Sequence, residues 1–175
     1  MINLQLFADA VKGKRIVYLF RRYDSRTTKT GLAVAFVTDN ERSLERDSDS
    51  VETKDGSVAS GGSLSHTISA NYLEAVNSDG MTSDDLEQAI IDDAKMEIWE
   101  ANLDDAGTTS GKFKGKYFQG KITSWNRQSP ADDMAEGEVE FLINGGGASG
   151  DVTVSASVID AAIYVFDDTI AMDMA

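Results

Sequence analysis

The chain has 175 residues, a hydrophobic fraction of 41% and a formal net charge of −14 at pH 7. This length fits one globular domain with a buried core, and the lack of cysteine excludes disulfides, thiolate catalysis and zinc sites built on sulfur. The acidic balance argues against ordinary nucleic-acid binding, because a protein that follows phosphates needs a basic patch. No apolar run approaches the ~20 residues of a membrane-spanning helix, so we expect no membrane span, and no signal peptide is expected at the amino terminus.

The charge is unevenly distributed along the chain. Residues 1–54 carry ten Lys and Arg against eight Asp and Glu, whereas residues 55–175 carry six against twenty-two. The two parts therefore have net charges of +2 and −16. Such asymmetry permits complementary faces between identical copies of the chain.

Two apolar runs near the amino terminus are predicted to be the first core strands. Residues 16–20 and residues 32–37 are nearly continuous apolar stretches, which is typical of strands buried on both faces. The polar residues 23–30 between them form a plausible hairpin connection.

Residues 39–62 change in character to mixed charge, with five serines, three glycines and few apolar anchors. We therefore expect a long inserted loop, which is usually either functional or disordered. A small hairpin around Asp55 and Gly56 is compatible with this composition.

Residues 63–72 show the cleanest alternation in the chain and predict a strand with one buried face. Its apolar face includes His66, the single histidine, which we interpret as a core imidazole and not as a base or a metal ligand. The opposite face carries small neutral polar residues, namely Ser65, Thr67, Ser69 and Asn71.

Residues 81–102 predict an amphipathic helix followed by a short strand. Thr82 and Asp85 have the spacing of a capping box, and Leu86, Ala89 and Ile90 recur at helical spacing. After Lys95 the apolar period becomes two, and the polar residues 102–107 are expected to end the strand.

Three further strands are expected towards the carboxyl terminus, over residues 112–125, 138–143 and 152–158. In the first of these the apolar phase slips near Tyr117, which predicts a bulge or a strong bend.

Both ends of the chain are expected to be arms, over residues 1–12 and 159–175. Each end contains a short apolar stretch that stands apart from the predicted core. The candidate contact residues in these arms are Leu4, Leu6, Phe7, Ile163, Tyr164, Val165 and Phe166.

We find no set of residues for catalysis, a metal or a cofactor. The glycine-rich residues 144–150 lack the lysine of a phosphate-binding loop and do not open a helix. Asp47 and Asp49 resemble the start of a calcium loop, but the later ligand positions are wrong. The adjacent Asp pairs, such as Asp92 with Asp93, point apart and indicate solvated surface.

The predicted elements indicate a single mainly β (α+β) domain, which is a β-sandwich or barrel flanked by one α-helix, with a long inserted loop and extended terminal arms. Such a domain without catalytic residues is typical of an assembly subunit, because strand edges and arms are satisfied by neighbouring copies.

Five short segments are informative through their order and spacing. They are residues 3–8 (NLQLFA), 52–57 (ETKDGS), 96–99 (MEIW), 120–125 (GKITSW) and 136–141 (EGEVEF). With these segments the chain resembles, over nearly its whole length, the major tail proteins, or tail tube proteins, of long-tailed bacteriophages, and most closely the TP901-1-type family.

The resemblance implies a structural virion protein whose hexameric rings stack into a hollow tail tube. Its implied partners are further copies of the chain, the tape-measure protein, the tail terminator, distal tail proteins and double-stranded DNA in passage; it would be assembled in the host cytoplasm. The inserted loop would join one ring to the next through Arg42, Glu45, Arg46, Asp47, Lys54 and Asp55. Residues 63–71, with their neutral hydroxyls, and residues 112–121 are both candidates for the lumen wall.

Two other functions stay open at this point. A receptor- or carbohydrate-binding module of a baseplate or adhesin would use Trp99 and Trp125 as exposed platforms. A hydrolase would need paired carboxylates with shifted pKa values in one cleft.

Overall fold

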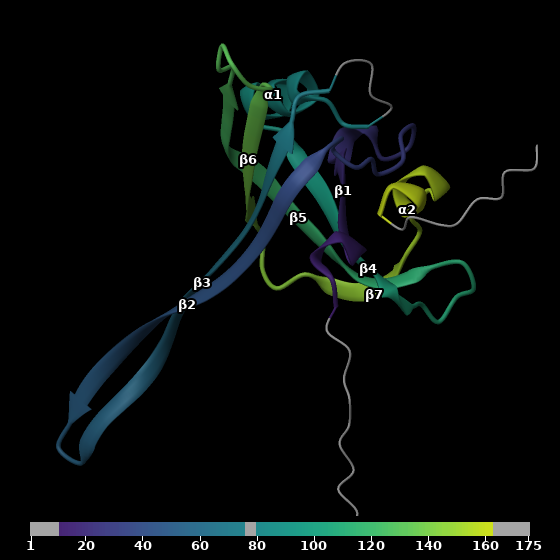
Figure 1. Ribbon diagram of the computed structural model, residues 1–175. Coiled ribbons are helices and arrows are strands. Elements are labelled where there is room, and N and C mark those ends of the chain that lie inside the picture. Colours follow the sequence, from purple (N-terminus) through teal and green to yellow (C-terminus); the bar gives the residue numbers. More distant parts are fainter. Residues whose placement is uncertain (1–10, 76–79, 163–175) are drawn as a thin grey trace, which may run out of the picture.

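The computed structural model describes residues 11–75 and 80–162. Its seven strands form one antiparallel sheet in the order β1-β4-β5-β6-β3-β2, and β7 pairs with β5 (Figure 1). The mainly β fold class expected from the sequence is confirmed. The strands are β1 (Ile16–Arg22), β2 (Val37–Thr53), β3 (Gly56–Leu73), β4 (Lys95–Ala106), β5 (Phe113–Gln128), β6 (Glu136–Ile143) and β7 (Ala148–Val152). The helices are α1 (Ser83–Ile91) and α2 (Ala156–Ala162), and the 3-10 turns are η1 (Gly13–Arg15) and η2 (Tyr23–Ser25).

The sheet curves so strongly that its two ends meet across one interior. Phe20 of β1 stacks on Phe141 of β6 with 5.1 Å between ring centroids, although two strands separate them in the sheet. Tyr18 Oη donates a hydrogen bond to Glu100 Oε2 at 2.6 Å, and Arg42 Nε donates to the same oxygen at 2.8 Å. Because Arg42 belongs to the last strand in the order and Glu100 to the second, this cluster closes a barrel-like roll.

The larger core fills the inside of this roll and is covered by α1. The helix buries Leu86 and Ala89, the positions expected from their spacing. Thr82 is its N-cap, and the predicted capping box with Asp85 is confirmed: Asp85 N donates to Thr82 Oγ1 at 3.2 Å and Thr82 N donates to Asp85 Oδ2 at 3.0 Å. The largest side chains of this core are Phe20, Phe118, Phe141, Ile68, Met96 and Ile98.

A second, smaller core lies on the opposite face of the sheet under α2. It contains Leu19, Ala101 and Leu103, and Ile159 of α2 packs on it. The bulge predicted near Tyr117 is wrong, because β4 and β5 pair without a shift from Gly115 to Lys121. The strong bend, which was the alternative, stays a prediction. The apolar phase changes there because Phe113 packs on the second core, whereas Phe118 packs on the first.

Residues 39–62 form paired strands and not the predicted inserted loop. β2 and β3 make one long hairpin whose last pair is Thr53 with Gly56, so Lys54 and Asp55 form the turn. The small hairpin considered around this turn is therefore the end of a much longer one (Figure 1). The sequence pattern indicates a loop because neither face of the outer ribbon is buried, and without burial no apolar alternation appears.

Three other boundaries differ from the sequence prediction. Within residues 32–37, Leu32 and Val34 make only isolated bridges, to Phe20 and Met81, and β2 begins at Val37. The extended chain is interrupted at Phe36, whose φ of 51° is left-handed. Residues 152–158 leave the sheet at Val152 and enter the unexpected helix α2, whose first turn bonds to Ser155 O. β4 continues to Ala106, past the polar residues that were expected to end it.

Residues 159–162 of the expected carboxyl-terminal arm belong to α2 and pack on this subunit's own sheet. In the described ranges 11–75 and 80–162, no helix has the length and apolar character needed to cross a membrane.

Candidate assembly surfaces

The outer half of the β2–β3 hairpin is a two-stranded ribbon that projects from the rolled sheet (Figure 1). From Glu45 to Ser60 every residue is exposed. Val51 and Val58 are cross-strand partners and each is 57% exposed. An isolated two-stranded ribbon is at best marginally stable in water, and paired apolar side chains at its end favour contact with another surface.

The predicted ring-joining residues are distributed over this hairpin unequally. Arg42 points into the roll and pairs with Glu100 of the same subunit. Arg46 Nη1 donates to Gly62 O at 3.0 Å within the ribbon. The other predicted residues are exposed on the ribbon or at its turn, namely Glu45, Asp47, Lys54 and Asp55.

The predicted lumen residues lie on the outer face of the sheet, and two of them, Ser69 and Asn71, lie between carboxylates on both sides. β3 is flanked by β2 on one side and β6 on the other, and cross-strand partners share a face. In one cross-strand row Asn71 lies between Asp39 and Glu138. In the next row Ser69 lies between Glu41 and Glu140. Thr67 follows on the same face between Ser43 and Leu142, and Ser65 pairs with Glu45. The result is an acidic face with a neutral centre, named here the acidic face.

The acidic face was only partly predictable. The alternation of Glu136, Glu138 and Glu140 is visible in the sequence, but its position beside β3 depends on strand pairing. The sequence pattern predicts a loop at Asp39 and Glu41 and therefore gives no sign that they contribute to this face.

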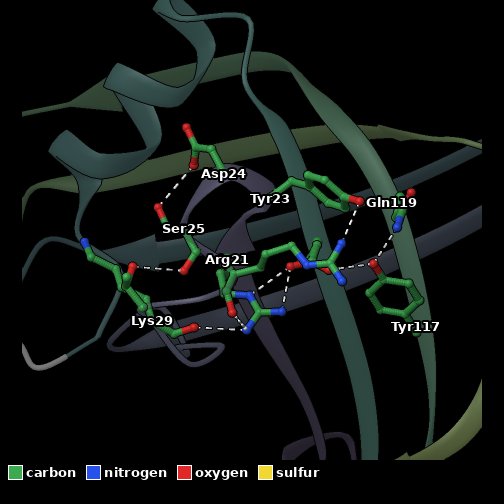
Figure 2. A network of polar contacts seen from close by, with 10 residues as sticks. Arg21, Tyr23, Asp24, Ser25, Lys29, Tyr117 and Gln119 are labelled. Carbon is green, nitrogen blue, oxygen red and sulfur yellow. Dashed lines mark hydrogen bonds and ion pairs between the residues drawn. The ribbon is translucent and has the colours of Figure 1, made fainter.

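A polar network over β1, β4 and β5, on the outer face of the sheet, holds residues 23–31 (Figure 2). Glu97 is only 3% exposed, and its carboxylate accepts from Arg21 Nε at 2.8 Å and from Tyr117 Oη at 2.7 Å. Arg21 Nη1 also donates to Lys29 O at 2.9 Å. Burial raises the pKa of Tyr117. This buried charge is paired as stability requires, so the network is a structural clamp.

The residues singled out for other chemistry have structural partners. His66 is buried, its Nδ1 donates to Gly145 O at 2.8 Å, and Phe118 meets its ring edge-on, so the core interpretation is confirmed. Trp125 Nε1 donates to Tyr72 Oη at 3.1 Å, and Trp99 lies under the Arg21 guanidinium. Within the ranges 11–75 and 80–162, no group of three or more His, Asp or Glu side chains is arranged to hold a metal.

The candidate arm residues lie outside the described part of the chain. They are Leu4, Leu6, Phe7, Ile163, Tyr164, Val165 and Phe166.

Comparisons with known proteins agree with the resemblance in the sequence. A family model described as phage tail tube protein matches residues 10–148. A protein of Staphylococcus phage phiMR25 that carries the name tail protein is 32% identical over 162 residues, which cover 90% of this chain and 82% of that protein.

The chain belongs to the phage tail tube protein family.

Solved tail tubes share the fold of this tail tube protein at low sequence identity. The SPP1 tail tube protein superposes with a TM-score of 0.70 at 14% identity, covering 94% of this chain and 92% of that one. A chain from the tail of a gene transfer agent particle has a TM-score of 0.59 at 17% identity, covering 79% of this chain and 98% of that one. A chain from the sheath-tube complex of an extracellular contractile injection system has a TM-score of 0.54 at 11% identity, covering 83% of this chain and 95% of that one. The finer TP901-1-type assignment stays a prediction.

Proposed function

We propose that six copies of this tail tube protein close into a ring and that the rings stack into a tube around a tape-measure protein. A tail terminator and distal tail proteins would close the two ends, and double-stranded DNA would later pass through the lumen. The gene transfer agent tail, a neighbour of the same fold, was refined with C6 symmetry, which supports the choice of six. The tube would be assembled in the host cytoplasm and act in the virion.

The observation that carries this proposal is the fully exposed β2–β3 ribbon. A subunit that acted alone would leave a long two-stranded ribbon, with Val51 and Val58 at its end, entirely in water. Contact with the next ring would cover these side chains and the ribbon residues Glu45, Arg46, Asp47, Lys54 and Asp55. The arm residues at both ends would add further contacts between subunits.

The acidic face supports a lumen position for Ser65, Thr67, Ser69 and Asn71. DNA is a dense row of negative charges, so a wall of carboxylates with small neutral side chains offers it no counter-charge. Passage of DNA then meets no strong binding site. By this argument β3, and not the lysine-bearing start of β5, faces the lumen.

A shortened hairpin tests the proposal. Ser48 and Gly61 are cross-strand partners, so deletion of residues 49–53 and 56–60 lets Lys54 and Asp55 close the same turn with Gly61 in the place of Gly56. Negative-stain microscopy of the purified wild-type protein should show regular tubes, and the shortened variant should give none. Its circular dichroism and cooperative thermal transition should be retained, because the deletion removes no core residue.

A full-length control carries Ser50→Thr and Ser57→Thr, which keep the ribbon intact, and it should form tubes. Tubes of normal length from the shortened variant would contradict the stacking role of the ribbon. A wild-type protein that stays monomeric at all concentrations and salt conditions would contradict the proposed function as a whole.

A further inference from the structure

The loop between β6 and β7 contains the one asparagine of the chain that a glycine follows, Asn144 before Gly145. Both residues are exposed. In such a pair the amide nitrogen of the glycine can attack the side-chain carboxamide carbon of the asparagine, because glycine has no Cβ to hinder the approach. The reaction also requires that the fold leave the two groups free to meet.

The structure leaves both reacting groups free. The Gly145 amide nitrogen and the Asn144 carboxamide form no hydrogen bond within residues 11–75 and 80–162. Beyond its two chain neighbours, no residue lies within 4 Å of the place where a Cβ of Gly145 would stand. The φ of Gly145 is 71°, a left-handed conformation that belongs to a turn and not to a paired strand. The pair is therefore protected neither by a strand partner nor by a covering side chain.

The rest of the subunit holds this segment at two points. Asn144 N donates to Gln119 O at 2.8 Å, and His66 Nδ1 donates to Gly145 O at 2.8 Å. His66 is only 1% exposed, and its Nε2 has no hydrogen-bond partner in the described part of the chain. The buried imidazole thus depends on the carbonyl of Gly145 for its hydrogen bond, because buried polar groups need a partner.

We infer that Asn144 deamidates spontaneously in the folded subunit and that its isoaspartyl product detaches the β6–β7 loop from His66. Gly145 N bonds to Asn144 Cγ and loses its proton, while the Cγ–Nδ2 bond breaks and ammonia leaves, which closes a succinimide ring. Water then opens the ring. Attack of water at Cγ gives aspartate, whereas attack at the main-chain carbonyl carbon gives isoaspartate, in which the chain continues through Cβ and Cγ. Water is the only further reactant.

Only the isoaspartyl product changes the main chain. It inserts a methylene group between Asn144 Cα and Gly145 N, which displaces Gly145 O from His66 Nδ1. A buried polar group that loses its partner lowers the stability of the fold. The aspartyl product keeps the main chain and adds a charge at an exposed position, so it should leave the stability unchanged. The modification takes place within one subunit and does not require the proposed tube.

Peptide mapping by mass spectrometry tests the reaction. After incubation of the purified protein in mildly alkaline buffer, the peptide that contains Asn144 should gain the mass difference between an amide and an acid. Its fragments should include both aspartate and isoaspartate. Asn126 is also exposed but precedes Arg127 in β5, and it should stay unchanged. Asn144→Gln is the matched control, because its longer side chain would have to close a larger ring.

A synthetic peptide of residues 139–150 gives the rate of the same reaction without the fold. Conversion in the folded protein should proceed at a comparable rate. A folded protein that keeps the Asn144 amide while the peptide converts would overturn the inference.

Thermal denaturation tests the consequence for His66. Aged wild type should melt roughly 2–4 °C below fresh wild type, the shift that accompanies loss of a buried hydrogen bond in a domain of this size. Fresh Asn144→Asp should melt with the fresh wild type, and aged Asn144→Gln should show no shift. An equal loss in fresh Asn144→Asp, or no loss in protein that contains isoaspartate, would overturn the detachment from His66.

Discussion

At the scale of single residues, Asp151 shows how one carboxylate fixes a turn between distant parts of the chain. Asp151 of β7 accepts from Thr108 Oγ1 at 2.7 Å, from Thr109 N at 2.7 Å and from Thr108 N at 3.2 Å. These hydrogen bonds to the charged form, led by that of the Thr108 hydroxyl, lower the pKa of Asp151 to about 2. The turn between β4 and β5 is thereby attached to β7.

Substitution Asp151→Asn should lower the melting temperature at pH 7, because the amide oxygen cannot replace the charged acceptor. The stabilisation by the charged form is present above the pKa of an unfolded aspartate, about 3.9, and is lost as pH falls through about 2. The difference in melting temperature between wild type and variant should therefore shrink from about pH 4 to about pH 2. Thermal denaturation over this range measures it.

The matched control for this experiment is Asp132→Asn, an exposed carboxylate with no hydrogen-bond partner in the described residues. Its melting temperature should follow the wild type at every pH. A difference for Asp151→Asn that stays constant down to pH 2 would count against the role of the charge.

At the scale of elements, α1 depends on its cap and on its docking. It has nine residues, which is shorter than a helix that is stable alone in water. The reciprocal Thr82 and Asp85 bonds satisfy its first free amides, and Leu86 and Ala89 are buried in the core of the roll. The helix therefore forms because the sheet gives its apolar stripe a place to pack.

Substitution Thr82→Ala should reduce the free energy of unfolding by about 1 kcal/mol, the usual cost of losing an N-cap. Urea denaturation of the unassembled subunit measures this quantity. Thr82→Ser keeps the hydroxyl and should lie close to the wild type. Equal losses in both variants would assign the effect to the methyl group and not to the cap.

At the scale of the whole molecule, the two faces of one sheet are used differently. The inside of the roll is packed, whereas the outer face is packed under α2 and is polar and acidic over β2, β3 and β6. The ribbon extends β2 and β3 beyond the core. The β2–β3 hairpin thus contributes to the core of the subunit, to its acidic face and, in the proposed tube, to its contact with other copies.

Reversal of the acidic face should make assembled tubes retain DNA. Tubes with Glu41→Lys, Glu138→Lys and Glu140→Lys should protect short duplex DNA from nuclease, and the protection should fall as salt rises. Wild-type tubes should protect none.

A control with Glu87→Lys, Asp132→Lys and Asp160→Lys changes the net charge equally but lies off the acidic face. DNA bound at these positions should remain open to digestion. Protection by the control, or none by the first variant, would argue against a lumen position for this face.

Much of the fold follows from local signals in the sequence. The capping box at Thr82, the apolar positions of α1, the alternation from His66 to Tyr72 and that from Val139 to Ile143 are all where the pattern predicts them. The core role of His66 follows from its place in that alternation. These features depend on periodicity and on short-range hydrogen bonds, which the order of residues specifies directly.

The sequence by itself determined the fold class, the helix α1, the absence of cysteine chemistry and the resemblance to tail tube proteins. Only the tertiary structure decided that residues 39–62 are a ribbon, that Asp39 and Glu41 share a face with Glu138 and Glu140, and that Arg42 closes the roll on Glu100. The physical reason is that strand pairing and curvature join residues far apart in the chain. A ribbon with two wet faces also carries no burial pattern from which its pairing could be inferred.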